Sequence, residues 1–398
     1  MFRRGSFALC LLLLGACQRT TPPSEPAVPD AGPAAAAVAP PAAPSAHVHE
    51  PLPPCRARGI APLDAALDYL DEGRFPEALS CAAQASALEP DSAAAHAARG
   101  EALAALHRTA EAQVAYARAL AIDPGHPEGL LGAAHLYAVQ LPSSREYDEL
   151  GALYAERGLS QPEVSPELMP RFALVAAMAL NDLGQAAEAL QRASLVLARE
   201  PKNAEAAYEK ALALFELCRF AEAKVAFSGL VLDPERGAHA HYHLGLLLER
   251  EGKWKQARGH LEKARFLSPE DFPVPPTLSE EEFRGEVALA VAALPEDMRK
   301  DLTGVPVRAE ELPADEDLLS GEPPLSPSIL GLFRGPPLGE PCDGTETPCR
   351  SVALYRLNLA RAVRTREELR EQIKVTLLHE VGHLRGEDDQ ELAARGLE

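Results

Sequence analysis

Apolar and small residues recur with a regular period between residues 55 and 271. Prolines such as Pro90 and Pro124 mark the period. Within each period the apolar positions follow helical spacing in two stretches, which predicts two helices. Small residues such as Gly100 and Ala112 fall where these helices cross, and the proline ends the second helix because it cannot continue the hydrogen-bond ladder. The pattern predicts an all-α array of antiparallel helix pairs.

The spacing from Pro90 to Pro124 resembles that of the tetratricopeptide repeat, whose length is about 34 residues. The resemblance implies a solenoid over residues 55–271 whose concave face binds a peptide or a partner protein. The alternative is an array that serves only as a spacer. Residues 127–169 carry extra prolines and form a degenerate unit without a clear register. The units that match the repeat are residues 59–92, 93–126, 170–202, 203–236 and 238–271.

After residue 272 the pattern changes to short strands and helices separated by prolines, which predicts a small α+β domain over residues 272–398. Ser279 followed by Glu282 predicts a capping box at the start of a helix. Short strands are predicted at residues 305–308, 329–333 and 351–357, and a long helix at about residues 365–384.

The strand at residues 351–357 has the strongest strand pattern of the three. We expect it to form the edge of a cleft and to pair there with an extended peptide by strand addition. Tyr355 lies in this strand. Two roles are open to it, packing on the sheet or donating a hydrogen bond to a reacting carbonyl oxygen, and packing is the favoured interpretation.

The long helix ends in the sequence His379-Glu380-Val-Gly-His383. The two histidines are one helical turn apart on the same face, so both imidazoles can reach one Zn²⁺ at about 2.0–2.1 Å. Glu380 points about 100° away from His379, toward a water on the metal rather than toward the metal itself. It is therefore the expected general base for hydrolysis of a peptide bond.

A zinc site needs a third protein ligand, and the sequence continues from His383 only as far as Glu398. We therefore expect this ligand close to the motif. Gly386 can adopt a left-handed conformation that ends the helix and turns the chain back toward the metal. Asp389 is then the expected third ligand. Its neighbours Glu387 and Asp388 are the alternatives.

Residues from about 282 to 392 resemble the minimal-zincin domain of bacterial metallopeptidase-like proteins. The resemblance implies Zn²⁺ bound by His379, His383 and Asp389 and a catalytic role for Glu380. It is carried by Val-x-Val at 305–307, Leu-Gly-Leu-Phe-Arg-Gly at 330–335, Ala-Leu-Tyr-Arg-x-Asn-Leu at 353–359 and the HExxHxxGxxD motif that ends at Asp389.

An insertion that carries Cys342 and Cys349 departs from the minimal-zincin pattern. The two cysteines flank a short, turn-rich loop, so we expect them to form a disulfide in an oxidising compartment. A structural zinc site is the weaker alternative, because no second cysteine pair or histidine lies nearby in the sequence.

The first residues are typical of an export signal: Arg3 and Arg4, then a short apolar run, then Leu-Gly-Ala-Cys17. This ending resembles the lipobox of bacterial lipoproteins, which implies lipidation of Cys17 after removal of the signal, residues 1–17. Residues 18–54 are rich in alanine and proline and predict a disordered linker. Gln18 rather than aspartate follows the cysteine, which favours the periplasmic face of the outer membrane.

The formal net charge of −20 argues against nucleic acid as a partner, because the negatively charged protein would repel the phosphate backbone. Two functions remain. The first is a membrane-anchored zinc metallopeptidase whose array binds a protein partner or substrate. The second is a non-catalytic envelope scaffold that acts through its repeats. Glu380 favours the enzyme, because a purely structural zinc site needs no general base.

Overall fold

The computed structural model describes residues 52–56, 59–162, 164–342 and 348–397. The expected signal peptide, the lipidation site Cys17 and nearly all of the linker at 18–54 lie outside these residues. Among the described residues, no helix is both long enough and apolar enough to cross a lipid bilayer.

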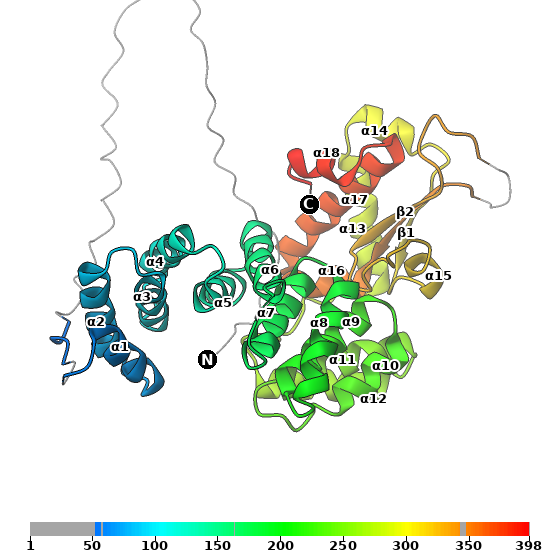
Figure 1. Cartoon of the computed structure of the whole chain (residues 1–398). Helices are drawn as coiled ribbons and strands as arrows, with labels where there is room; N and C mark the ends of the chain where they lie inside the picture. Colours follow the sequence, from blue (N-terminus) through cyan, green and yellow to red (C-terminus); the bar gives the residue numbers. More distant parts are fainter. Residues whose placement is uncertain (1–51, 57–58, 163, 343–347, 398) are drawn as a thin grey trace, which may run out of the picture.

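Helices α1 to α12 form the repeat array, a curved row of antiparallel helix pairs (Figure 1). The degenerate unit also folds as a helix pair, α5 with α6, and a π-helical turn follows α5. The pairs are α1 (Pro62–Asp71) with α2 (Phe75–Leu88), α3 (Ala93–Ala105) with α4 (Thr109–Ile122), α5 (Pro127–His135, continued by η1, Leu136–Gln140) with α6 (Arg145–Leu159), α7 (Leu168–Asp182) with α8 (Ala186–Arg199), α9 (Ala204–Glu216) with α10 (Phe220–Ser228), and α11 (Gly237–Arg250) with α12 (Trp254–Leu267).

Small residues allow the two helices of a pair to approach closely, as the sequence pattern predicts. A β-carbon at Gly100 would lie 2.7 Å from the ring of Tyr116, and one at Gly245 would lie 2.7 Å from the side chain of Leu261. Both distances are far below van der Waals contact, so a larger residue would force the helices apart. The predicted all-α array is confirmed.

The C-terminal region contains a three-stranded sheet with helices packed on it (Figure 1). The strand order is β1-β3-β2, with β1 parallel and β2 antiparallel to the central strand β3. The predicted α+β class is confirmed. The elements are α13 (Glu280–Ala293), α14 (Glu296–Asp301), β1 (Val307–Glu310), α15 (Asp315–Leu318), β2 (Gly331–Arg334), β3 (Ser351–Tyr355), α16 (Arg356–Arg361), α17 (Arg366–Arg385) and α18 (Asp389–Ala394).

The expectation that residues 351–357 form the edge of a cleft is wrong. β3 occupies residues 351–355 only and is hydrogen-bonded on both sides, to β1 and to β2, so no side of it is free for a peptide strand. All five of its residues are buried. Tyr355 is fully buried, and its hydroxyl lies 3.4 Å from an Nη atom of Arg334. It therefore packs in the core of the region.

Helix α17 supplies one wall of this core through Leu369, Ile373, Leu377, Val381 and Leu384, all of which are buried against the sheet. A capping box of Thr365 and Glu368 begins the helix, and Ser279 and Glu282 form the predicted box at the start of α13. These contacts fix the direction of α17, which carries the metal-ligand motif at its C-terminal end.

The repeat array and the C-terminal region contact each other through α11. Arg361 of α16 forms an ion pair with Glu249, and both side chains are largely buried. Arg250 lies beside Glu249, pairs with Asp315 and donates a hydrogen bond of 3.1 Å to the carbonyl of Pro313. The Arg361–Glu249 pair is the buried one of the two, and removal of one partner from such a pair is strongly destabilising.

Candidate metal centre

His379 and His383 project from successive turns at the end of α17, with their ring centroids 4.6 Å apart. The helix ends at Gly386, whose φ of 89° is the left-handed conformation that the sequence predicted. The chain then reverses into α18, whose first residue is Asp389. This reversal returns a carboxylate to the two imidazoles.

The two acidic neighbours of Asp389 are engaged elsewhere. Asp388 caps α18 by accepting a hydrogen bond of 2.9 Å from the Glu391 N–H. Glu387 forms an ion pair with Arg395. Of the three consecutive carboxylates, only Asp389 forms a cluster with the histidines, as preferred from the sequence.

The three ligand atoms form a small triangle. The Nε2 atoms of His379 and His383 are 3.0 Å apart, and Oδ1 of Asp389 lies 3.6 Å and 3.2 Å from them, respectively. Ligands bound to tetrahedral zinc at about 2.0–2.1 Å lie about 3.3 Å from one another. The triangle therefore fits a single Zn²⁺. We refer to these three residues as the metal triad.

Main-chain carbonyls set the orientation of both imidazoles. Nδ1 of His379 donates to the carbonyl of Leu397 at 2.5 Å, and Nδ1 of His383 donates to that of Glu387 at 3.0 Å. With the proton on Nδ1, the lone pair of each ring lies on Nε2 and faces the triangle. Both histidines are thus in the tautomer that leaves Nε2 available to bind a metal.

Glu380 lies beside the metal triad, between α17 and β2. Its side chain is 5% exposed, and its Oε2 accepts a hydrogen bond of 2.7 Å from the Phe333 N–H. Burial raises the pKa of Glu380 to about 7, and the charge of Asp389 acts in the same direction. A carboxyl group with a pKa near neutrality is suited to exchange protons with a substrate.

Two sequence models match parts of the chain. The zincin-like metallopeptidase model matches residues 302–397, and a tetratricopeptide repeat model matches residues 63–127 and 219–272. The chain combines tetratricopeptide repeats with a zincin-like metallopeptidase domain. No curated protein sequence matches this chain.

Several solved structures resemble the repeat array. Pseudomonas aeruginosa PilF is 19% identical, with 57% of this chain and 96% of that chain covered and a TM-score of 0.43. PilW, a type IV pilus biogenesis factor, is 18% identical over 53% of this chain and 94% of that chain, with a TM-score of 0.44. YrrB, described as having an unusual peptide-binding site, is 19% identical, with 48% of this chain and 93% of that chain covered and a TM-score of 0.39.

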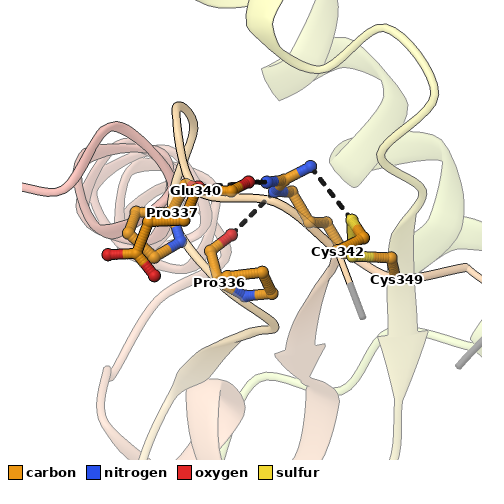
Figure 2. Close-up of a disulfide and its surroundings, with 6 residues drawn as sticks. Pro336, Pro337, Glu340, Cys342 and Cys349 are labelled. Carbon is orange, nitrogen blue, oxygen red and sulfur yellow. Dashed lines mark hydrogen bonds between the residues drawn. A yellow bond between two sulfur atoms is a disulfide. The ribbon is translucent and has the colours of Figure 1, made fainter. Parts of the chain in front are cut away.

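A disulfide joins Cys342 and Cys349 at the rim of the zincin-like domain (Figure 2). Arg350 follows it and donates hydrogen bonds to three carbonyls of the same loop, those of Pro336, Pro337 and Glu340. The N–H of Leu338 in this loop donates to the carbonyl of Leu384 at 2.6 Å. The segment 336–340, which precedes Cys342, is thereby attached to the end of α17, next to the metal triad.

The sequence pattern does not point to several supporting residues. Gly331 is required because a β-carbon there would lie 2.7 Å from Thr376 and 2.9 Å from Glu380. Phe333 and Leu397 act through main-chain atoms, which leave no signature in the sequence. A second disulfide, Cys55–Cys81, joins cysteines far apart in the sequence and has no local signal.

Proposed function

We propose that the protein is a membrane-anchored zinc metallopeptidase whose repeat array binds a protein partner or substrate. The observation that carries the proposal is the metal triad, whose three ligand atoms lie 3.0–3.6 Å apart with both histidines in the metal-binding tautomer. When bound, Zn²⁺ supplies Lewis-acid chemistry, which polarises a peptide carbonyl and lowers the pKa of water.

Glu380 is the residue that exchanges the proton. The Phe333 N–H holds its Oε2, and this leaves Oε1 to take a proton from the attacking water and deliver it to the leaving amine. Burial raises the pKa of Glu380 in the metal-free protein, and a bound Zn²⁺ would lower it again and favour the carboxylate form that accepts the proton. The same hydrogen bond fixes the carboxylate against β2, so the base does not have to be ordered during the reaction.

The anchor and the location rest on the sequence. The signal-like start and Leu-Gly-Ala-Cys17 favour a lipid-anchored protein of the bacterial cell envelope, at the periplasmic face of the outer membrane. The disulfides Cys55–Cys81 and Cys342–Cys349 fit an oxidising compartment. Metabolic labelling with palmitate tests this: label in the wild type and none in Cys17→Ser is expected, and equal labelling contradicts it.

The second candidate function is a non-catalytic envelope scaffold that acts through its repeats. One observation favours it: Glu380 is buried and hydrogen-bonded to Phe333, a contact that a structural role would also explain. In that case the zincin-like domain serves as a folded platform held against α11 by the Arg361–Glu249 pair.

Zinc analysis and proteolysis of unfolded casein separate the two functions. We expect about one zinc per chain in the wild type and in Glu380→Gln, and little zinc in His383→Ala. Casein cleavage is expected only in the wild type. Glu380→Gln is the matched control, because glutamine keeps an oxygen for the Phe333 N–H but cannot accept the proton. Zinc without cleavage by the wild type supports the scaffold instead.

A further inference from the structure

A pocket of about 370 Å³ opens between α3 and α4, in the second repeat of the array. It lies far in the sequence from the metal triad and is not part of that site. We call it the basic pocket. Its lining includes His96, Arg99, Glu111, Val114, Ala115 and Arg118.

Arg99 occupies a position that is filled by a buried leucine in the last repeat. Pro124 and Pro269 end equivalent repeats, and Arg99 precedes the first by the same interval as Leu244 precedes the second. Leu244 is 3% exposed and packs between helices. The register is supported by the next residue in each repeat, a glycine that makes the close helix crossing described above. Counted in the same way from Pro90, Pro201 and Pro234, three other repeats have the buried residues Ala65, Ala176 and Glu209 at this position. The second repeat therefore has a guanidinium group where the last repeat has apolar packing.

The buried Nε of Arg99 has no hydrogen-bond partner among the residues that the structure covers. The carboxylate in the lining of the pocket, Glu111, is already bound by Arg108 through two contacts of 2.7 Å. A buried N–H group without an acceptor is unfavourable, and the last repeat has apolar packing at the equivalent position. The charged Glu209 at the equivalent position of another repeat accepts a hydrogen bond of 2.8 Å from Asn181, whereas the acceptor for the Nε of Arg99 is expected to come from a ligand.

The other polar groups of the basic pocket favour an anion of low charge. Arg118 is exposed and lies 3.7 Å from Asp91, a loose contact that a ligand can displace. Nε2 of His96 donates to the carbonyl of Pro90 at 3.0 Å. Glu111 lies at the wall and opposes a doubly charged phosphate more strongly than a carboxylate.

The apolar surface of the basic pocket indicates which kind of molecule would bring a carboxylate to Arg99. Val114 is 70% exposed and, with Ala115, forms a wall beside the arginines. The methylene groups of a glutamate side chain can pack on this wall while its carboxylate reaches the guanidinium of Arg99 in a bidentate pair. A bare inorganic anion makes no use of this surface.

We propose that the basic pocket binds a glutamate side chain of an acidic peptide segment in a partner protein, with Arg99 as the bidentate donor and Arg118 as a second cation at the rim. This deepens the proposed partner binding by the repeat array and does not depend on the metal triad. The site explains how a chain with a net charge of −20 can recognise an acidic partner locally.

Fluorescence anisotropy with the full-length protein tests the proposal. The probe is a short labelled peptide that alternates glutamate with alanine, and the comparison peptide has glutamine in place of every glutamate. We expect the glutamate peptide to bind at least about tenfold more tightly, and Arg99→Leu to remove most of this difference. Arg118→Gln is expected to weaken binding by a smaller factor.

Arg99→Leu restores the residue of the equivalent core position, so we expect its melting temperature to equal or exceed that of the wild type. Loss of binding is then not a loss of folding. Arg145→Gln, at an arginine whose side chain is 83% exposed on α6, is the matched control and should bind as the wild type does. Zinc content, measured on the same samples, should not change, which separates this site from the metal centre.

Three results would overturn the proposal. The first is equal binding of the glutamate and glutamine peptides, or no binding of either to the wild type. The second is wild-type affinity in Arg99→Leu. The third is competition by inorganic phosphate at concentrations as low as those of the peptide, which would indicate a simple anion site.

Discussion

His243 provides a quantitative prediction about the stability of the repeat array. Its imidazole is 6% exposed and stacks on Phe227 with ring centroids 4.6 Å apart, between Phe215 and Tyr208. Burial lowers its pKa from 6.5 to about 4, and the charge of His239 acts in the same direction, against a hydrogen bond from Nδ1 to the His239 carbonyl. The folded array therefore holds this histidine neutral.

The sign of the effect follows from the direction of this shift. Between about pH 6.5 and about pH 4 the unfolded chain binds a proton at His243 more readily than the folded chain does, so stability falls as the pH falls through that window. The pKa of His243 is 6.5 in the unfolded chain and about 4 in the folded chain. This difference lowers the free energy of unfolding by about 2 kcal/mol when the pH is reduced from about 7.5 to about 5.

His243→Phe isolates this contribution, because phenylalanine keeps an aromatic ring against Phe227 and cannot be protonated. Urea unfolding of both proteins, followed by circular dichroism at the two pH values, gives the free energies. We expect the wild type to lose about 2 kcal/mol more than the variant on acidification. Equal losses in the two proteins would refute the reasoning, whatever their absolute stabilities.

Three further predictions concern the zincin-like domain. Gly331→Ala places a β-carbon 2.9 Å from Oε1 of Glu380. We therefore expect the free energy of unfolding in urea to fall by about 2 kcal/mol and casein cleavage to slow, with zinc retained. Unchanged cleavage would contradict the position assigned to the base. Deletion of residues 396–398 removes the carbonyl that orients His379, so zinc binding should weaken about tenfold or more. Competition with a chelator measures this affinity. The control Leu397→Ala keeps the carbonyl and should bind zinc as the wild type does. Arg361→Ala leaves the buried carboxylate of Glu249 unpaired and should lower the free energy of unfolding in urea by about 3 kcal/mol. A change below about 0.5 kcal/mol would mean that the contact between the repeat array and the C-terminal region does not depend on this pair.

The repeat array could be predicted from the sequence because its determinants are local and periodic. Regularly spaced prolines such as Pro90 and Pro124, and a small residue such as Gly100 opposite Tyr116, are visible without any long-range contact. The register of residues 127–169 was not predictable, because the π-helical turn at Leu136–Gln140 departs from regular helical spacing.

The metal ligands were predictable for a similar reason: helical spacing and one left-handed glycine bring them together. The order of the strands was not. Which strand lies in the centre is decided by pairing between residues far apart, such as Val307 with Val352, and an alternating pattern describes only a single strand. For the same reason the carbonyl of Leu397 and the N–H of Phe333 had to be found in the structure, since main-chain contacts do not depend on residue type.

Zinc K-edge X-ray absorption of the purified protein tests the central claim most directly. We expect about one zinc per chain, with two imidazole nitrogens and carboxylate or water oxygens at about 2.0–2.1 Å and no sulfur. His383→Ala should lose this spectrum, whereas Glu380→Gln should keep it. A metal-free protein under zinc-replete conditions, or a first shell without imidazole, would contradict the assignment of His379, His383 and Asp389 as ligands.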